Sequence, residues 1–379
     1  MAPALTPSLR RTLAVGVVLV AGAAATEAAR APAVYRFAVS AVAIAALAAV
    51  VGESLEVIGE RVGPGATGLL HSGVGNLPEL LVGIFALRRG LVGVVQAALV
   101  GSVLGNLLLV LGIALIAGGL RHGTQRFDPE EPRLYGSLLL VIVGALLVPT
   151  LAHHLDLPAA RHGRALSDID AVVLLVLYAA SAVFLLRRRD GRSVAGATPA
   201  AGATPAAGTA PLAGTAPAAG TAPAAGAARL ASAIGVLVAA GVAAAVVSDW
   251  FVGALEPATR ALRISPAFTG LVVVALASNA VENAVSVRFA LRAQPAYALA
   301  TTLASPLQIA LLLTPLLVLV SPAVGPVPLT LVFSPLLVAA LGIGTLVVVV
   351  VVYDGEYTWI EGVALVGLYV TVAAAFWWG

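Results

Sequence analysis

Apolar stretches long enough to cross a lipid bilayer recur along almost the whole of this 379-residue chain. A membrane-spanning helix needs about 20 apolar residues, and a backbone in lipid must satisfy its own hydrogen bonds, which favours helices. Hydrophobic residues make up 60% of the sequence and charged residues 10%, so a water-soluble core could not bury them all. We expect about eleven spanning helices, at 12–29, 35–58, 66–88, 91–119, 133–152, 168–187, 229–253, 264–292, 295–321, 329–352 and 356–378.

One segment interrupts this pattern. Residues 190–228 repeat short units such as AGATPA and AGTAPA, whose Ala, Thr, Pro and Gly cannot supply a core, so we expect a disordered linker. The arginine run at 187–189 favours a cytoplasmic linker and therefore a cytoplasmic N-terminus. The predicted organisation is an N-terminal segment with a leading helix (1–34), a first repeat (35–189), the linker (190–228) and a second repeat (229–379).

The two halves around the linker contain matching motifs. The sequence GNLPELL in the third span aligns with SNAVENA in the eighth, which pairs Asn76 with Asn279 and Glu79 with Glu282 at an offset of 203 residues. Five crossings separate the copies, so they enter the membrane from opposite sides. The sequence thus predicts an all-α polytopic membrane protein, with one leading helix and two inverted five-helix repeats. Such repeats place a substrate site near the membrane midplane.

Oxygen-bearing side chains gather around the two motifs. A carboxylate inside hydrocarbon is costly and therefore indicates function, and hydroxyl and amide oxygens accompany it in both halves. The chain has no cysteine, so thiolate ligands are excluded. Carboxylate, amide and hydroxyl oxygens suit a hard cation, and Ca²⁺ fits better than Mg²⁺, which keeps its water. The candidate ligands are Glu79, Glu282, Asn76, Asn279, Ser102, Ser305, Gln308 and Asn106.

Other polar residues in apolar surroundings have two interpretations each. Glu53, Glu56 and Glu60 form an acidic stripe on one helix face, which is either an ion vestibule or a solvated helix end. His71 is either a structural residue or part of a proton path. Glu361, near the start of the last span, is interpreted as structural.

These motifs resemble the calcium/proton antiporter family of the calcium:cation antiporter superfamily. The resemblance rests on GERVGPGATGLLHSGVGNLPELLVGIFALRRG, VVQAALVGSVLGNLLLVLG, SNAVENAV, SPLQIALLLTPLLVL and YDGEYTWIEGVALVGLY, and it covers nearly all of the membrane region. It implies eleven helices, with a hydrophilic segment after the sixth, and cation binding by the repeat glutamates Glu79 and Glu282. Acidic residues at Glu53 and Glu56 also match the family, which favours the vestibule.

The chain departs from the family pattern at several positions. Where the second repeat usually reads GNAAEH, this sequence has Ser278 for Gly and Asn283 for His. Pro78 before the first glutamate resembles the sodium/calcium branch, and Pro306 interrupts a small polar run before Gln308. Sodium coupling therefore stays open.

The predicted function is a secondary transporter that exchanges Ca²⁺ for H⁺ by alternating access. The alternatives are a sodium/calcium-type exchanger and a cation channel that uses the same glutamates as a filter. An enzyme is not expected, because no HExxH motif, thiol or activated serine is present. No cofactor is expected beyond the transported Ca²⁺ and the coupling H⁺. We expect a prokaryotic plasma membrane as the location, membrane lipids as partners and no nucleic-acid partner. A homo-oligomer is possible on this sequence.

Overall fold

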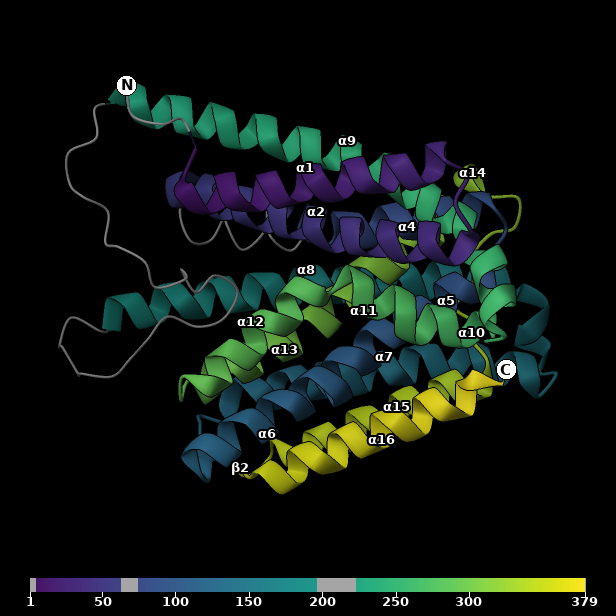
Figure 1. Cartoon of the computed structure of the whole chain (residues 1–379). Coiled ribbons are helices and arrows are strands. Elements are labelled where there is room, and N and C mark those ends of the chain that lie inside the picture. The colour runs from purple at the N-terminus through teal and green to yellow at the C-terminus, as the bar shows by residue number, and fades with distance from the viewer. Residues whose placement is uncertain (1–4, 63–73, 196–222, 379) are drawn as a thin grey trace. The chain divides into compact units, whose positions relative to one another are not determined.

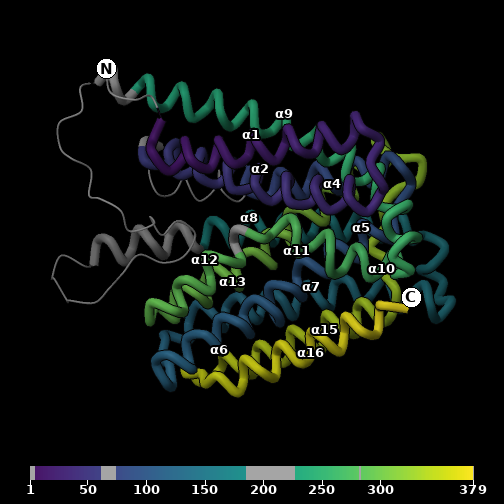
Figure 2. The backbone as a smooth tube through the Cα atoms, viewed as in Figure 1, coloured from purple at the N-terminus to yellow at the C-terminus, as the bar shows by residue number. Residues whose placement is uncertain are grey.

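The structure is a computed structural model that describes residues 5–62, 74–195 and 223–378. Within these helices, the side chains of residues 61, 62, 185–195, 223–226, 281 and 282 lie outside the description. Figure 1 shows the helices, and Figure 2 follows the same backbone as a tube.

By their internal contacts, the residues form two compact units. Unit 1 comprises Met1–Phe85 and Gly208–Arg263, and unit 2 comprises Ala86–Ala207 and Ile264–Gly379. Each unit therefore takes residues from both sequence repeats. The repeats are a relation between sequences, whereas the units reflect which helices pack together.

Unit 1 is built from long α-helices. Helix α2 packs against both α1 and α9 (Figure 1). The rings of Phe37 and Phe251 stack at 4.7 Å between centroids, joining α2 to α9. Thr6 caps α1 by accepting a hydrogen bond from the Leu9 amide. The helices are α1 (Pro7–Ala28), α2 (Ala33–Val62), α9 (Pro223–Leu262) and the first part of α4 (Leu77–Arg88), which continues into unit 2.

Unit 2 contains interrupted helices. Three π-helical turns occur in its described part: η1 (Gly105–Val110), η3 (Thr269–Val274) and η4 (Ile309–Leu313). Strands β1 (Gln125–Arg126) and β2 (Glu356–Tyr357) pair antiparallel. The remaining elements are α5 (Val92–Leu104), α6 (Leu111–His122), α7 (Glu130–His154), η2 (Pro158–His162), α8 (Gly163–Ala195), α10 (Pro266–Phe268), α11 (Ala275–Ser278), α12 (Ala280–Leu291), α13 (Pro295–Gln308), α14 (Thr314–Val324), α15 (Pro335–Val351) and α16 (Trp359–Trp377).

The all-α polytopic membrane fold predicted from the sequence is confirmed. The described residues contain eight helices long and apolar enough to cross a membrane, or nine if the bent pair Pro266–Ser278 and Asn283–Leu291 is one span. The apolar helix α15 is shorter, and the expected span 66–88 overlaps residues 63–73, which are not described. Eleven helices stay a prediction.

Several predicted boundaries change. The span expected at 329–352 begins as a helix only at Pro335, because Ser334 caps it and proline is favoured in the first turn. Helix α8 continues to Ala195 and α9 begins at Pro223, so both enter the expected linker 190–228. Alanine and arginine are good helix formers, which explains the extension. Residues 196–222 of that linker lie outside the described part.

Glu361 has the structural role expected for it. Its carboxylate accepts hydrogen bonds from the backbone amide of Thr358 at 2.6 Å and from the Thr358 hydroxyl at 3.0 Å. Together these residues form a capping box that fixes the start of α16.

Candidate functional site

The second repeat motif lies on a broken helix in unit 2. Elements α10, η3 and α11 run to Ser278, and α12 begins at Ala280 after a bend of 63°. Between them Asn279 has φ −99° and ψ 10°, outside the helical region. Its carbonyl oxygen still accepts from the Asn283 amide at 3.1 Å, so the first turn of α12 is closed. The second motif therefore lies at a bend between two helices.

The side-chain amide nitrogen of Asn279 lies within hydrogen-bond distance of three acceptors, which share its two hydrogens. This nitrogen, Nδ2, donates to the Ala275 carbonyl at 3.1 Å, to Ser278 Oγ at 3.2 Å and to Ser102 Oγ at 3.3 Å. The residue is 3% exposed, and its Oδ1 has no hydrogen-bond partner among the described residues. Such an oxygen is costly to bury without a donor or a cation. Asn279 therefore offers a preoriented oxygen ligand.

Helix α5 supplies the neighbouring hydroxyl. Ser102 is 6% exposed, and its backbone carbonyl accepts from Nδ2 of Asn106 at 2.9 Å. Asn106 itself is 2% exposed and lies in the π-helical turn η1. The structure thus brings three predicted site residues together, namely Ser102, Asn106 and Asn279. Ser278, which was noted only as a departure from the family motif, belongs to the same hydrogen-bonded group.

Helix α13 repeats the arrangement of α5. Ser305 is 5% exposed, and its Oγ has no hydrogen-bond partner within the described ranges. Gln308 ends α13, and η4 follows immediately, just as η1 follows α5. The offset of 203 residues that aligns the motifs also aligns the two π-helical turns. Because α13 packs against α5, both copies of this interruption lie in one compact unit.

The first repeat motif begins α4. Asn76 is 5% exposed, and its carbonyl accepts from the Leu80 amide at 3.0 Å. Glu79 lies in the first turn of α4, where a carboxylate interacts favourably with the helix dipole. The side chain of Glu282 and the whole of His71 fall outside the described part, so their predicted roles stay predictions.

The acidic stripe on α2 is only partly in contact with other elements. Glu53 Oε1 accepts from the hydroxyl of Thr12 on α1 at 2.7 Å, which joins two helices of unit 1. Glu56 and Glu60 are exposed. This arrangement agrees with either interpretation of the stripe, as a vestibule or as a solvated helix end.

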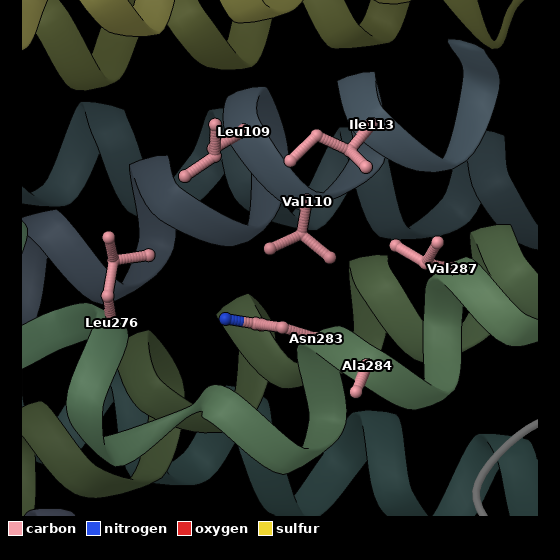
Figure 3. A pocket seen from close by; sticks show the side chains of 7 residues that line it. All are labelled: Leu109, Val110, Ile113, Leu276, Asn283, Ala284 and Val287. Carbon is pink, nitrogen blue, oxygen red and sulfur yellow. The ribbon is translucent and has the colours of Figure 1, made fainter. Parts of the chain in front are cut away.

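A pocket opens beside Asn283 in unit 2. Its volume is about 400 Å³, and Figure 3 shows the Asn283 side chain of α12 directed toward the side of Leu276 on the preceding α11, with Val110 of η1 on the facing wall. Oδ1 of Asn283 has no hydrogen-bond partner in the described chain. Asn283 is not among the ligands predicted from the sequence, although it belongs to the same polar SNAVEN motif as Asn279. The lining residues are Leu109, Val110, Ile113, Leu276, Asn283, Ala284 and Val287.

Conventional metal-ligand clusters are absent from the described residues. No group of three or more His, Cys, Asp or Glu side chains there could hold a metal ion. The predicted positions include amide and hydroxyl side chains beside the carboxylates. Such neutral oxygens are ordinary ligands for Ca²⁺.

The long apolar helices define a polytopic membrane protein, and one helix pair is bent at the second repeat motif, beside buried amide and hydroxyl groups. The family model described as sodium/calcium exchanger protein matches residues 32–187 and 232–378. The chain therefore belongs to the sodium/calcium exchanger family and, within it, to the calcium/proton antiporters, which are transporters and not enzymes.

Individual relatives match most of the chain. A Ca²⁺/H⁺ antiporter of Synechocystis sp. is 35% identical over 341 residues, which cover 90% of each chain. The antiporter ChaA of Bacillus subtilis is 30% identical over 350 residues, covering 91% of this chain and 92% of the relative. The crystal structure of the selenium-substituted Ca²⁺/H⁺ antiporter YfkE has a TM-score of 0.76 at 27% identity, covering 97% of this chain and 99% of that one.

Proposed function

We propose that this chain exchanges Ca²⁺ for H⁺ by alternating access, with Glu79 and Glu282 binding the cation near the membrane midplane. The observation that carries the proposal is Asn279, whose nitrogen is held by three acceptors while its buried Oδ1 meets no donor in the described residues. An oxygen held in this way suits a hard cation. Glu282 follows three residues later, in the first turn of α12.

The remaining predicted ligands would complete an oxygen shell. Ser102 and Asn106 are buried beside Asn279, and Ser305 is buried on α13 with an Oγ that has no partner among the described residues. We assign Asn76 and Gln308 to the same shell by the repeat. Among candidate cations Ca²⁺ is favoured, because it accepts six to eight oxygen ligands, including neutral ones.

Charge balance explains why protons can replace the cation. Two carboxylates neutralise one Ca²⁺, and two protons bound to the same carboxylates leave the site equally neutral. Burial disfavours the charged form of a carboxyl group, which makes protonation at ambient pH accessible. A site that stays nearly neutral in both states avoids the cost of carrying net charge through hydrocarbon. The names of the Synechocystis and Bacillus relatives support this exchange.

Sodium coupling is the second candidate, and two residues favour it. Pro78 precedes the first glutamate, as in the sodium/calcium branch, and Asn283 stands where the proton branch has histidine. A sodium site would need additional oxygen ligands around the calcium site, whereas proton coupling needs only the carboxylates. We therefore assign protons as the coupling ion.

Proteoliposomes test the assignment. The purified protein is reconstituted into three sets of vesicles: sodium-free vesicles with an outward proton gradient, Na⁺-loaded vesicles with an outward sodium gradient and no pH gradient, and sodium-free vesicles with no gradient. Ca²⁺ uptake is measured in each set. We expect uptake only with the proton gradient, and weaker uptake when the loading side is acidified, because H⁺ and Ca²⁺ compete for Glu79 and Glu282. Uptake that requires sodium would contradict proton coupling. Ca²⁺ current that needs no counter-ion gradient would instead indicate a channel.

We also infer the orientation of the chain in a prokaryotic plasma membrane. The arginine run at 187–189 and the positive-inside rule support a cytoplasmic N-terminus and linker.

A further inference from the structure

A short extended segment lies buried in unit 2 between α14 and α15. We call residues 329–333 the strap. Leu329 and Leu331 are fully buried and Phe333 is 2% exposed, although the segment is not helical. The backbone polar groups of a buried irregular segment must find hydrogen-bond partners within the protein.

One edge of the strap is bound by helices α7, α8 and α14. Ser321 Oγ accepts from the Leu329 amide at 2.8 Å, and Ser167 Oγ accepts from the Leu331 amide at 2.9 Å. Further contacts on this edge alternate along the chain, as expected for an extended segment. They are Phe333 amide to Thr150 Oγ1 at 3.2 Å, His154 Nε2 to the Phe333 carbonyl at 3.3 Å, and Arg164 Nη1 to the Leu329 carbonyl at 3.4 Å.

The opposite edge is bound by Gln96 of α5. Its Nε2 donates to the Thr330 carbonyl at 3.0 Å and to the Val332 carbonyl at 2.8 Å. These two residues are the alternate members of the strap, so their carbonyls point away from α7 and α8. Gln96 is thus the side chain of α5 that connects this helix to the strap through both donors of one amide.

The other side of α5 is packed against η3 without spare room. A β-carbon at Gly101 would overlap the carbonyl oxygen of Leu271, and one at Gly270 would lie 2.6 Å from the Val94 carbonyl oxygen. Helix α5 is therefore held between η3 and the strap. Because α5 also carries Ser102, its position determines whether Ser102 Oγ meets Nδ2 of Asn279.

The strap has no equivalent in the other repeat. The offset of 203 residues maps it onto 126–130, where Arg126 and Phe127 instead bond to the backbone next to β2. The residue of α13 that corresponds to Gln96 is Leu299, which has no amide to donate. The side-chain clamp on α5 is a property of one repeat only.

We propose that Gln96 is a positioning residue for cation exchange: it fixes α5 through the strap and thereby sets the contact between Ser102 and Asn279. This role rests on the proposed exchange function. Gln96 does not touch the cation. Its loss is expected to weaken Ca²⁺ binding more than it slows the turnover of saturated transporter.

Two substitutions at Gln96 separate hydrogen bonding from packing. Gln96→Met keeps the length but removes both donors, and Gln96→Lys restores donors. For Gln96→Met we expect the Ca²⁺ concentration at half-maximal uptake to rise roughly five- to thirtyfold, the size of one to two ordinary buried hydrogen bonds, with maximal uptake per folded protein within about twofold. Gln96→Lys should recover most of the affinity. Thr371→Val, which removes an exposed hydroxyl on α16, is the control and should match wild type.

Hydrogen exchange of residues 329–333, measured by mass spectrometry, tests the contact between Gln96 and the strap without relying on transport. Exchange should be faster in Gln96→Met than in wild type and should slow again in Gln96→Lys. Equal half-maximal Ca²⁺ concentrations in wild type and Gln96→Met, or equal values for the Met and Lys variants, would overturn the positioning role. If wild type shows no proton-driven uptake, the proposed function fails, and unchanged exchange of the strap would then separately refute the clamp.

Discussion

Unit 1 and unit 2 differ in how regular their helices are. In the described residues of unit 1, α1, α2 and α9 run without π-helical turns, and they pack through small residues and rings such as Gly16 and Phe37. Unit 2 contains three π-helical turns, the break at Asn279 and the extended strap. π-Helical turns often occur at functional sites.

The difference shows where backbone irregularity can be supported in a membrane protein. In unit 2 each interruption is accompanied by polar side chains that bind the freed groups, as Asn279 does at its break and Gln96 does at the strap. Unit 1 has a polar link of another kind, in which Thr12 donates to Glu53 between two intact helices. In unit 2 the irregular elements thus coincide with the buried polar side chains of Asn279 and Ser102.

The largest effect is expected from the glutamates, one of which belongs to each unit. Glu79→Gln and Glu282→Gln should each reduce Ca²⁺ uptake by about a hundredfold or more, because the bound Ca²⁺ would lose one of the two negative charges that neutralise it. If Glu79 and Glu282 contribute equally to binding, the two losses will be similar. Uptake is measured in proteoliposomes containing equal amounts of folded protein.

The control for these variants is Glu356→Gln. Glu356 forms an exposed ion pair with Arg126 at 3.2 Å, and such pairs contribute little. Its uptake should stay within about twofold of wild type. Wild-type uptake in either Glu79→Gln or Glu282→Gln would remove that residue from the cation site.

The sequence predicted the helices and the repeat, but not the irregular elements. Hydropathy identifies the membrane spans because a helix in contact with lipid needs apolar side chains. The offset that pairs Glu79 with Glu282 also pairs η1 with η4. Nothing in hydropathy distinguishes a π-helical turn from an α-helix, since both bury the same side chains. The strap was predicted as helix because its residues are apolar. Ser334 and Pro335 carried the signal for a later helix start.

The candidate site could also be predicted only in part, because motif spacing identifies residues but not their long-range contacts. The motif spacing identified Asn279 and Ser102 as candidates, and the structure joins them by a hydrogen bond. It could not reveal Gln96 as a partner of the strap, because that contact joins residues more than 230 positions apart. Long-range contacts of this kind depend on packing, which spacing along one helix does not encode.

An intermediate effect is expected from glycine substitutions that compare the two units directly. Gly101→Ala in unit 2 should destabilise the protein by about 1–3 kcal/mol, because its β-carbon would overlap the backbone of η3. Gly235→Ala in α9 of unit 1 meets no atom within 4 Å and should stabilise by about 0.5–1 kcal/mol. The melting temperature of the detergent-solubilised protein measures both. Equal shifts would show that unit 2 is not packed more tightly at α5 than unit 1 is at α9.

The smallest effect is expected from the linker that joins α8 of unit 2 to α9 of unit 1 along the chain. The sequence predicts that residues 190–228 serve only as a connection, and the cost of closing a flexible loop changes slowly, by about 0.6 kcal/mol for each twofold change in length. Deleting residues 207–218 should therefore leave Ca²⁺ uptake within about twofold of wild type. A variant in which the same residues are replaced by Gly and Ser controls for composition. If the shortened protein expresses and melts normally but loses uptake while the Gly/Ser variant keeps it, linker length matters for exchange. If both variants lose uptake, the sequence of the Ala/Thr/Pro/Gly repeat is itself required for transport, and the linker is more than a connection.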